Sequence, residues 1–270
     1  MRSVNSEAGL DTAQTTARKV GDHPALEVLA RVGFLVSGLL HIVLGYTIGR
    51  VAWGGGGSSA DQSGALATLA GNPAGTVLMW VIVIGLLALV LWQLTEAVGP
   101  GAELLERAKA AGRVIVYAAL AYTALQFATG SGSSQSSEQS SQDVTATLMQ
   151  QPAGQVLVGA IGVGIIGVGL DHAYKGLTRK FLDDLEQDPG ATARALGMIG
   201  YPAKGAVLVL VGVFFVIAAV QHQSSEAEGL DGALKSLRDE PFGPALLTVV
   251  AVGFVAFGIY LFARARHQRI

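Results

Sequence analysis

The chain has 270 residues, of which 51% are hydrophobic and 14% carry a charge, and its formal net charge is −2. Soluble domains usually contain about 25% charged residues, so this composition is typical of a membrane protein. The near-neutral charge gives no support to nucleic-acid binding, and a chain without cysteine forms no disulfide, thiol catalyst or zinc–thiolate site.

After a polar N-terminal segment, residues 1–26, the chain contains six long apolar runs. The segment lacks a signal-peptide pattern, so we expect a disordered cytoplasmic tail. A bilayer core about 30 Å thick needs about 20 apolar residues at 1.5 Å each, and runs without the alternation of barrel strands must satisfy their backbone as helices. The sequence therefore predicts six transmembrane helices, over residues 32–53, 75–97, 112–129, 154–174, 200–220 and 243–263.

Lysine and arginine predict how these helices are oriented. Of the 18 basic residues, only Arg50, Lys235 and Arg238 belong to one side of the membrane, which leaves 15 on the other side. Basic residues collect on the cytoplasmic side of membrane proteins. Both termini and the segments near 98–111 and 175–199 are therefore predicted to be cytoplasmic, in the bacterial cytoplasmic membrane.

A short phrase recurs at the end of each outer loop. It reads ALATLAGNPAG at 65–75, VTATLMQQPAG at 144–154 and ALKSLRDEPFG at 233–243. Its leucines, three apart, favour a short helical turn on the outer membrane surface, and proline is tolerated in the first turn of a helix. Each phrase is predicted to start a transmembrane helix, and a substrate-gating loop is the alternative. The motif residues are Pro73, Gly75, Pro152, Gly154, Pro241 and Gly243.

Three copies of a two-helix unit with one topology predict an all-α integral membrane protein built from three tandem parallel repeats. Such repeats are related by an axis along the membrane normal, so a pseudo-threefold bundle is expected. Gly38 and Gly45, with their counterparts Gly205 and Gly212, are expected to let helices pack closely. The predicted organisation is a tail at 1–26, repeats at 27–99, 100–178 and 179–266, and a C-terminal tail at 267–270.

The triplicated hairpin with its recurrent Pro-x-Gly resembles the bacterial family called domain of unknown function 1206, in which a pair of transmembrane helices occurs three times. The resemblance covers residues 27–266. The second copy departs from the others at Val144 and Thr145, where they have Ala-Leu, and it lacks the pair formed by Gly38 and Gly45. The resemblance implies the six-helix fold and supplies no activity.

Polar and ionisable side chains in or near the apolar runs are the candidate functional residues. His41, near mid-membrane, is a candidate proton relay, cofactor ligand, interhelical hydrogen-bond donor or packing residue. Lys204 is a candidate partner of Asp171. The full set is His41, Gln93, Glu96, Asp171, His172, Lys175, Lys204 and Arg264.

The ends of the predicted helices carry two further patterns. Glu96, Lys175 and Arg264 occupy equivalent repeat positions and would form one cytoplasmic ring. This ring is either a gate or vestibule, or a set of side chains that snorkel to the interface. Aromatic residues near helix ends, among them Tyr201 and Tyr260, are predicted to form an interfacial belt.

The segment from 175 to 198 is predicted to hold a short interfacial helix. Phe181, Leu182 and Leu185 would share its apolar face. A basic collar before that face is typical of anionic-headgroup binding, and a membrane-protein partner is the alternative. The collar consists of Lys175, Arg179 and Lys180.

The functional prediction is a non-enzymatic multi-pass membrane module with a structural, lipid-interacting or partner-binding role. No Gly-rich phosphate loop, HExxH, GxSxG or Cys/His cluster occurs, so no catalytic, cofactor or metal residue is predicted. A small transporter or channel along the axis is the alternative, favoured by the polar inner ends of the helices. An enzyme acting on lipid would have to rely on Asp171 and His172, which is a poor acid–base set.

Overall fold

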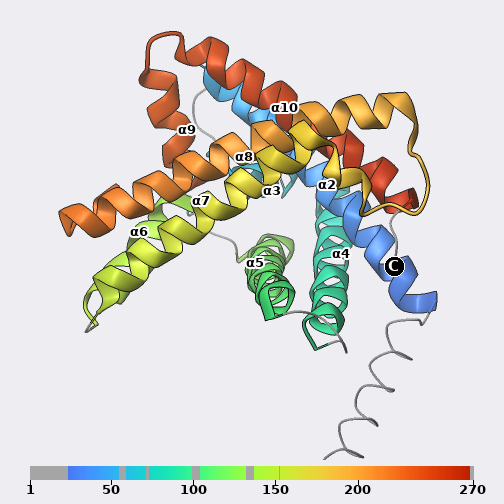
Figure 1. Ribbon diagram of the computed structural model, residues 1–270, viewed down its shortest axis with the longest axis horizontal. Helices are drawn as coiled ribbons and strands as arrows, with labels where there is room; N and C mark the ends of the chain where they lie inside the picture. Colours follow the sequence, from blue (N-terminus) through green and yellow to red (C-terminus); the bar gives the residue numbers. More distant parts are fainter. Residues whose placement is uncertain are drawn as a thin grey trace, which may run out of the picture.

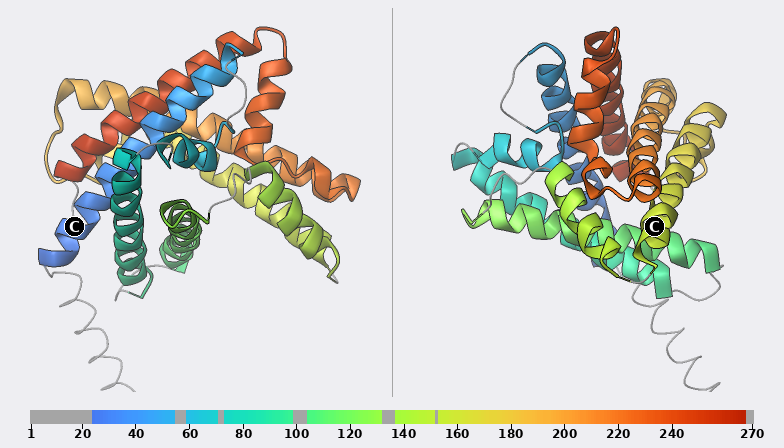
Figure 2. Two further views of the ribbon diagram at one scale, coloured as in Figure 1. Left: turned by 180° about the vertical axis from the view of Figure 1, so that it is seen from behind. Right: turned by 90° about the vertical axis from the view of Figure 1, so that its left-hand side faces the viewer.

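The described part of the chain is almost entirely helical (Figures 1 and 2). The computed structural model describes residues 24–54, 59–70, 73–98, 104–131, 137–151 and 153–267. Within these residues six helices are long and apolar enough to cross a membrane, as predicted. They are α2 (Pro24–Ala52), α4 (Pro73–Val98), α5 (Leu104–Ala128), α7 (Gly154–Thr178), α8 (Gly190–Gln221) and α10 (Gly243–His267).

Two of these helices extend beyond the predicted boundaries. α2 begins at Pro24, inside the predicted tail 1–26, of which residues 1–23 lie outside the described part. α8 begins at Gly190, well before the predicted start at residue 200. Its first turns are held by packing, since a Cβ added to Gly197 would lie 2.5 Å from the ring of Phe181.

A short helix precedes the second long helix of each repeat, as the recurrent phrase predicts. These helices are α3 (Gln62–Ala70), α6 (Ser137–Met149) and α9 (Leu230–Asp239). They are not merely turns on the membrane surface, as predicted, but pack into the protein, because Leu66 and Leu234 are fully buried. α9 is also tied to the first repeat: the amide of Ala60 donates to the buried carboxylate of Asp231 over 2.6 Å, and Lys235 pairs with that carboxylate at 2.7 Å.

In the second and third repeats the long helix begins at the glycine of the Pro-x-Gly phrase, and the residue before that glycine lies in a turn. This residue has a positive φ, 63° at Ala153 and 64° at Phe242. A Cβ added to Gly154 or Gly243 would collide with the backbone of the short helix just before it, so this close approach requires glycine. In the first repeat, α4 begins at Pro73 as predicted.

The long helices pack in pairs taken from different repeats: α2 beside α10, α7 beside α8, and α4 beside α5 (Figure 1). Glycines bring the first two pairs close together. A Cβ added to Gly38 would lie 2.7 Å from the carbonyl oxygen of Gly258, and a Cβ added to Gly169 would lie 2.7 Å from that of Gly205. The predicted packing role of Gly38 and Gly205 is confirmed.

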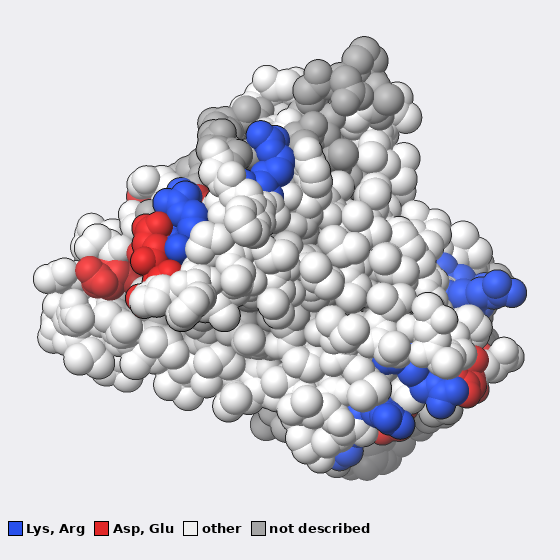
Figure 3. Space-filling view, turned by 90° about the horizontal axis from the view of Figure 1, so that it is seen from above, with Lys and Arg blue, Asp and Glu red and all other residues white. Residues whose placement is uncertain are grey.

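The outer faces of the long helices are apolar and exposed. In the second repeat, Ile115, Val156 and Val163 are 70%, 72% and 62% exposed. Figure 3 shows a broad uncharged surface with the charged side chains gathered toward two ends of the visible face. Such an arrangement is typical of helices surrounded by lipid.

The segment between α7 and α8 folds inward, so the predicted interfacial helix is wrong. Only a short 3-10 helix, η1 (Lys180–Leu182), forms within it. Phe181 is fully buried, and its ring centroid lies 5.1 Å from that of Tyr201 and 5.2 Å from that of Tyr260. The predicted belt is also wrong at Tyr201 and Tyr260, which are 3% and 0% exposed. Packing the three rings together removes more apolar surface from water than an interfacial position would.

Candidate functional site

Arg264, near the end of α10, joins three other parts of the chain. Its Nη2 lies 3.2 Å from Oδ2 of Asp184, in the segment between α7 and α8, and its Nη1 donates to the hydroxyl of Tyr201 on α8 over 3.0 Å. The guanidinium carbon lies 4.9 Å from the ring centroid of Phe34 on α2. An arginine that is both paired and stacked in this way holds its neighbours in a fixed geometry.

The aromatic rings beside Arg264 form the base of the site. The hydroxyl of Tyr260 donates to the backbone carbonyl of Phe181 over 3.3 Å. Tyr201 packs edge-to-face against Phe257, with the ring centroids 5.1 Å apart. These rings pack α8 and α10 together with the connecting segment.

Lys204 lies one turn after Tyr201 on α8, and its ammonium is directed at an aromatic ring. Nζ lies 4.6 Å from the ring centroid of Phe257. Within the described residues Lys204 makes no hydrogen bond or ion pair. The predicted pairing of Lys204 with Asp171 does not form, because Asp171 instead pairs with Lys175, its neighbour one turn along α7, at 3.6 Å.

His41 approaches the same ring from α2. Its ring centroid lies 4.9 Å from that of Phe257 and 6.0 Å from that of Phe254. Its Nδ1 lies 2.7 Å from the carbonyl oxygen of Ser37. Because a carbonyl only accepts, Nδ1 carries the proton and Nε2 is the nitrogen left for another partner.

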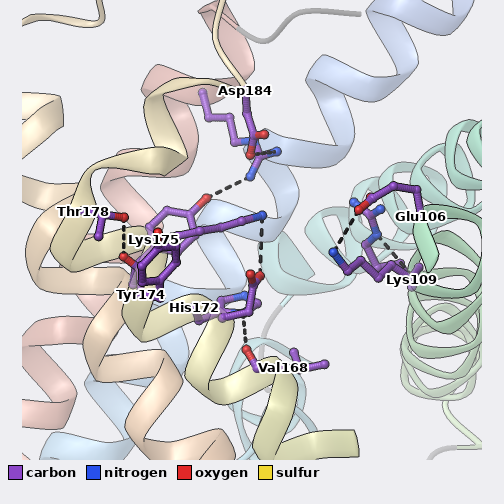
Figure 4. A network of polar contacts seen from close by, with 12 residues as sticks. Glu106, Lys109, Val168, His172, Tyr174, Lys175, Thr178 and Asp184 are labelled. Carbon is purple, nitrogen blue, oxygen red and sulfur yellow. Dashed lines mark hydrogen bonds and ion pairs between the residues drawn. The ribbon is translucent and has the colours of Figure 1, made fainter. Parts of the chain in front are cut away.

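His172 adopts the same arrangement on α7. Its Nδ1 lies 2.9 Å from the carbonyl oxygen of Val168, and its ring lies 5.7 Å from that of Tyr201 (Figure 4). Both His172 and Lys204 are within electrostatic range of His41. The structure therefore gathers three of the predicted residues around Phe257, which is not among the predicted site residues, and Tyr201, which was predicted only as part of the interfacial belt.

The predicted ring of Glu96, Lys175 and Arg264 is only partly visible. The side chain of Glu96 lies outside the described part. Among the described residues, Lys175 pairs with Asp171 and Arg264 pairs with Asp184. Gln93, one turn before Glu96 on α4, is buried, and its Oε1 has no hydrogen-bond partner among the described residues.

The collar residues lie close to this site on the surface. Lys180 lies with Nζ 5.0 Å from the ring centroid of Tyr174, which is itself 51% exposed. Arg179 is exposed and ends α7 with a positive φ of 62°. Figure 4 shows Lys175 among the residues of this polar network, with Glu106 and Lys109 of α5 drawn beside them.

The start of α5 carries a surface ion pair near the collar. Nζ of Lys109 lies 2.9 Å from Oε1 of Glu106, and both side chains are largely exposed. The hydrogen bond from Lys109 lowers the pKa of Glu106 below its ordinary value. An exposed pair of this kind contributes little to stability.

Comparison with known proteins identifies relatives but no activity. A family model described as Domain of Unknown Function (DUF1206) matches residues 32–99, 108–179 and 199–268. The uncharacterized protein YxxB of Bacillus subtilis is 29% identical over 259 residues, which cover 92% of this chain and 93% of that protein. No solved structure matches the chain.

Proposed function

The chain belongs to the family described as Domain of Unknown Function (DUF1206), and on that footing we propose that it is a non-enzymatic multi-pass module of the bacterial cytoplasmic membrane that engages anionic lipid. Each matched unit contains two of the six membrane-spanning candidates. The family description and the Bacillus relative carry no named activity, so the proposal depends on the surface of the molecule.

One observation carries the proposal: exposed cations adjoin exposed apolar side chains at the end of α7. Leu177 is 73% exposed and Tyr174 is 51% exposed, and Arg179 and Lys180 follow directly with exposed side chains. Aromatic and aliphatic groups next to lysine and arginine suit the boundary between acyl chains and anionic headgroups. A protein partner with an acidic segment is the competing occupant.

The predicted orientation and symmetry are part of the same proposal. The 15 basic residues on one side support a cytoplasmic position for both termini and the collar. The pseudo-threefold axis is supported by the contacts of Gly38 with Gly258 and of Gly205 with Gly169, which occupy corresponding positions in the repeats.

The lipid proposal is tested by purifying the protein in mild detergent and identifying retained lipids by mass spectrometry. The double variant Arg179→Gln, Lys180→Gln should retain less anionic phospholipid than the wild-type protein. Arg50→Gln is the matched control, because Arg50 is an exposed cation in the last turn of α2 and belongs to the predicted outer side of the membrane. Equal lipid retention by the double variant and the wild type contradicts the proposal.

A small transporter or channel remains the second candidate, favoured by the ionisable side chains around Phe257. His41 and Lys204 both lie within 5 Å of its ring centroid, and intramembrane ionisable groups often mark ion pathways. Proton flux in proteoliposomes tests it, with a decrease expected for His41→Leu. Unchanged flux in that variant removes His41 from any transport mechanism.

A further inference from the structure

The charges around Lys204 do not balance. Asp184 pairs with Arg264 and Asp171 pairs with Lys175, at 3.2 and 3.6 Å. Lys204, in contrast, makes only the contact with the ring of Phe257 among the described residues. The nearby ionisable groups on the other packed helices are Arg264, His172 and His41, and each of these is a cation or a neutral base. The site therefore carries a positive charge that no described carboxylate compensates.

A lone ammonium in this position is costly. A lysine within a membrane-spanning helix costs several kcal/mol unless it is paired or reaches water, and a contact with an aromatic face returns only about 0.5–2 kcal/mol. Lysine usually avoids this cost by extending its ammonium to water at the membrane surface. Here, however, Nζ is directed at the ring of Phe257 on α10, while Lys204 stays partly exposed, so an anion at the surface of the protein could reach the amine.

The surrounding helices hold this lysine in place. A Cβ added to Gly200, one turn before Lys204, would lie 2.6 Å from the backbone of Phe257. This close approach of α8 to α10 fixes the ring beneath the ammonium. His41 of α2 and His172 of α7 border the same aromatic surface, so side chains from all three repeats line the site.

We infer that Lys204 binds the phosphate of one anionic membrane phospholipid, held between its ammonium and the aromatic surface formed by Phe257 and Tyr201. This inference rests on the proposed engagement of anionic lipid and assigns it a specific buried contact. Although α8 begins at Gly190, the apolar run predicted from the sequence begins at residue 200. Lys204 lies about one helical turn, or about 6 Å, beyond that point, which is within reach of a headgroup phosphate. A lipid brings its own acyl chains to the exposed apolar residues nearby, such as Val168 and Ile199.

The test compares delipidated wild-type protein with Lys204→Gln and Lys204→Arg in native mass spectrometry. We expect the wild type to bind one phosphatidylglycerol at least about tenfold more tightly than phosphatidylcholine. Lys204→Gln should lose that preference, and Lys204→Arg should keep it. A tight phosphatidylglycerol that survives in Lys204→Gln overturns the inference, as does equal binding of the two lipids.

Two further measurements make two distinctions. The first distinguishes a lipid phosphate from free phosphate, and the second distinguishes a failure of this inference from a failure of the proposed function. If inorganic phosphate displaces phosphatidylglycerol completely, the site binds free phosphate and the lipid assignment is wrong. The collar variant Arg179→Gln, Lys180→Gln should reduce loosely retained lipid while leaving the single tight lipid in place. Loss of the tight lipid in the collar variant alone contradicts the inference and leaves the collar proposal standing.

A measurement on the wild-type protein keeps the inference testable if Lys204→Gln does not fold. Acylation of the Lys204 amine, followed by mass spectrometry, should be slowed by phosphatidylglycerol and not by phosphatidylcholine. Lys235 is the internal control, since it lies at the other end of the molecule and pairs with Asp231. Equal acylation of Lys204 with either lipid overturns the inference.

Discussion

Gly169 and Gly205 approach each other across α7 and α8 so closely that neither position has room for a methyl group. A Cβ on Gly169 would lie 2.7 Å from the carbonyl oxygen of Gly205, and a Cβ on Gly205 would lie 2.5 Å from that of Gly169. Gly38 and Gly258 repeat these two distances across α2 and α10. Backbone cannot yield as a flexible side chain does, so the two interfaces depend on glycine.

Gly169→Ala should therefore lower the unfolding temperature in detergent, since α7 and α8 would have to separate. Gly167→Ala, two residues earlier, is the matched control, because a Cβ there meets nothing within 4 Å. Alanine favours a helix over glycine by about 1 kcal/mol, so the control should be neutral or stabilising. An unfolding temperature unchanged in Gly169→Ala would show that the interface tolerates a methyl group.

Arg264→Gln should destabilise the protein by about 2 kcal/mol, because it removes a charge-assisted contact with Asp184 and leaves Tyr201 without its donor. Equilibrium unfolding in detergent measures this loss. Arg264→Lys should restore only part of it, since an ammonium cannot span both partners as the guanidinium does. Lys109→Gln, which breaks an exposed pair, should cost less than about 1 kcal/mol, and a similar loss in both variants would contradict the role of Arg264.

Asp231→Ala should loosen the contact between α9 and the first repeat. The substitution leaves the amide of Ala60 without its acceptor, at an expected cost of about 1–3 kcal/mol. Hydrogen exchange should become faster at Ala60 and slow exchange should persist in α8. Asp239→Ala provides the control, because that carboxylate is 70% exposed. Unchanged hydrogen exchange at Ala60 would show that another group holds α9 against the first repeat.

Ala153→Gly should raise stability by about 1 kcal/mol, because a left-handed backbone costs a non-glycine residue about that amount. Ala153 is exposed and has φ 63°, so little packing is lost. Ala160→Gly, at an exposed position inside α7, should change stability in the opposite direction by a similar amount. If both substitutions change the free energy of unfolding in the same direction, Ala153 is not strained.

The spans were predictable because the length of an apolar run is a local property with a fixed physical requirement. The pairing of Gly38 with Gly258 was not predictable, because one sequence does not state which helix lies beside which. The interfacial positions predicted for Tyr201 and Tyr260 were wrong for a related reason. Their places near helix ends suggest an interface, and their burial depends on Phe181, which reaches them only because the connecting segment folds inward.

Part of the candidate site could be predicted. His41, His172 and Lys204 were visible as rare ionisable residues in apolar surroundings, and the structure gathers them near one another. The direction of the Lys204 side chain was not predictable, since it depends on Phe257 of α10. Asp184 was not among the predicted site residues, because its pairing with Arg264 depends on the same inward fold.

The pairing of α2 with α10 also sets an order of events during synthesis. Chains emerge from the ribosome N-terminus first, so α2 enters the membrane long before α10 has been made. Until then the glycine face of α2, including Gly38 and Gly45, has no partner from α10. The contact between the first and the last of the membrane-spanning candidates therefore forms last, and until then the small residues on α2 are available to other membrane helices that present a similar face.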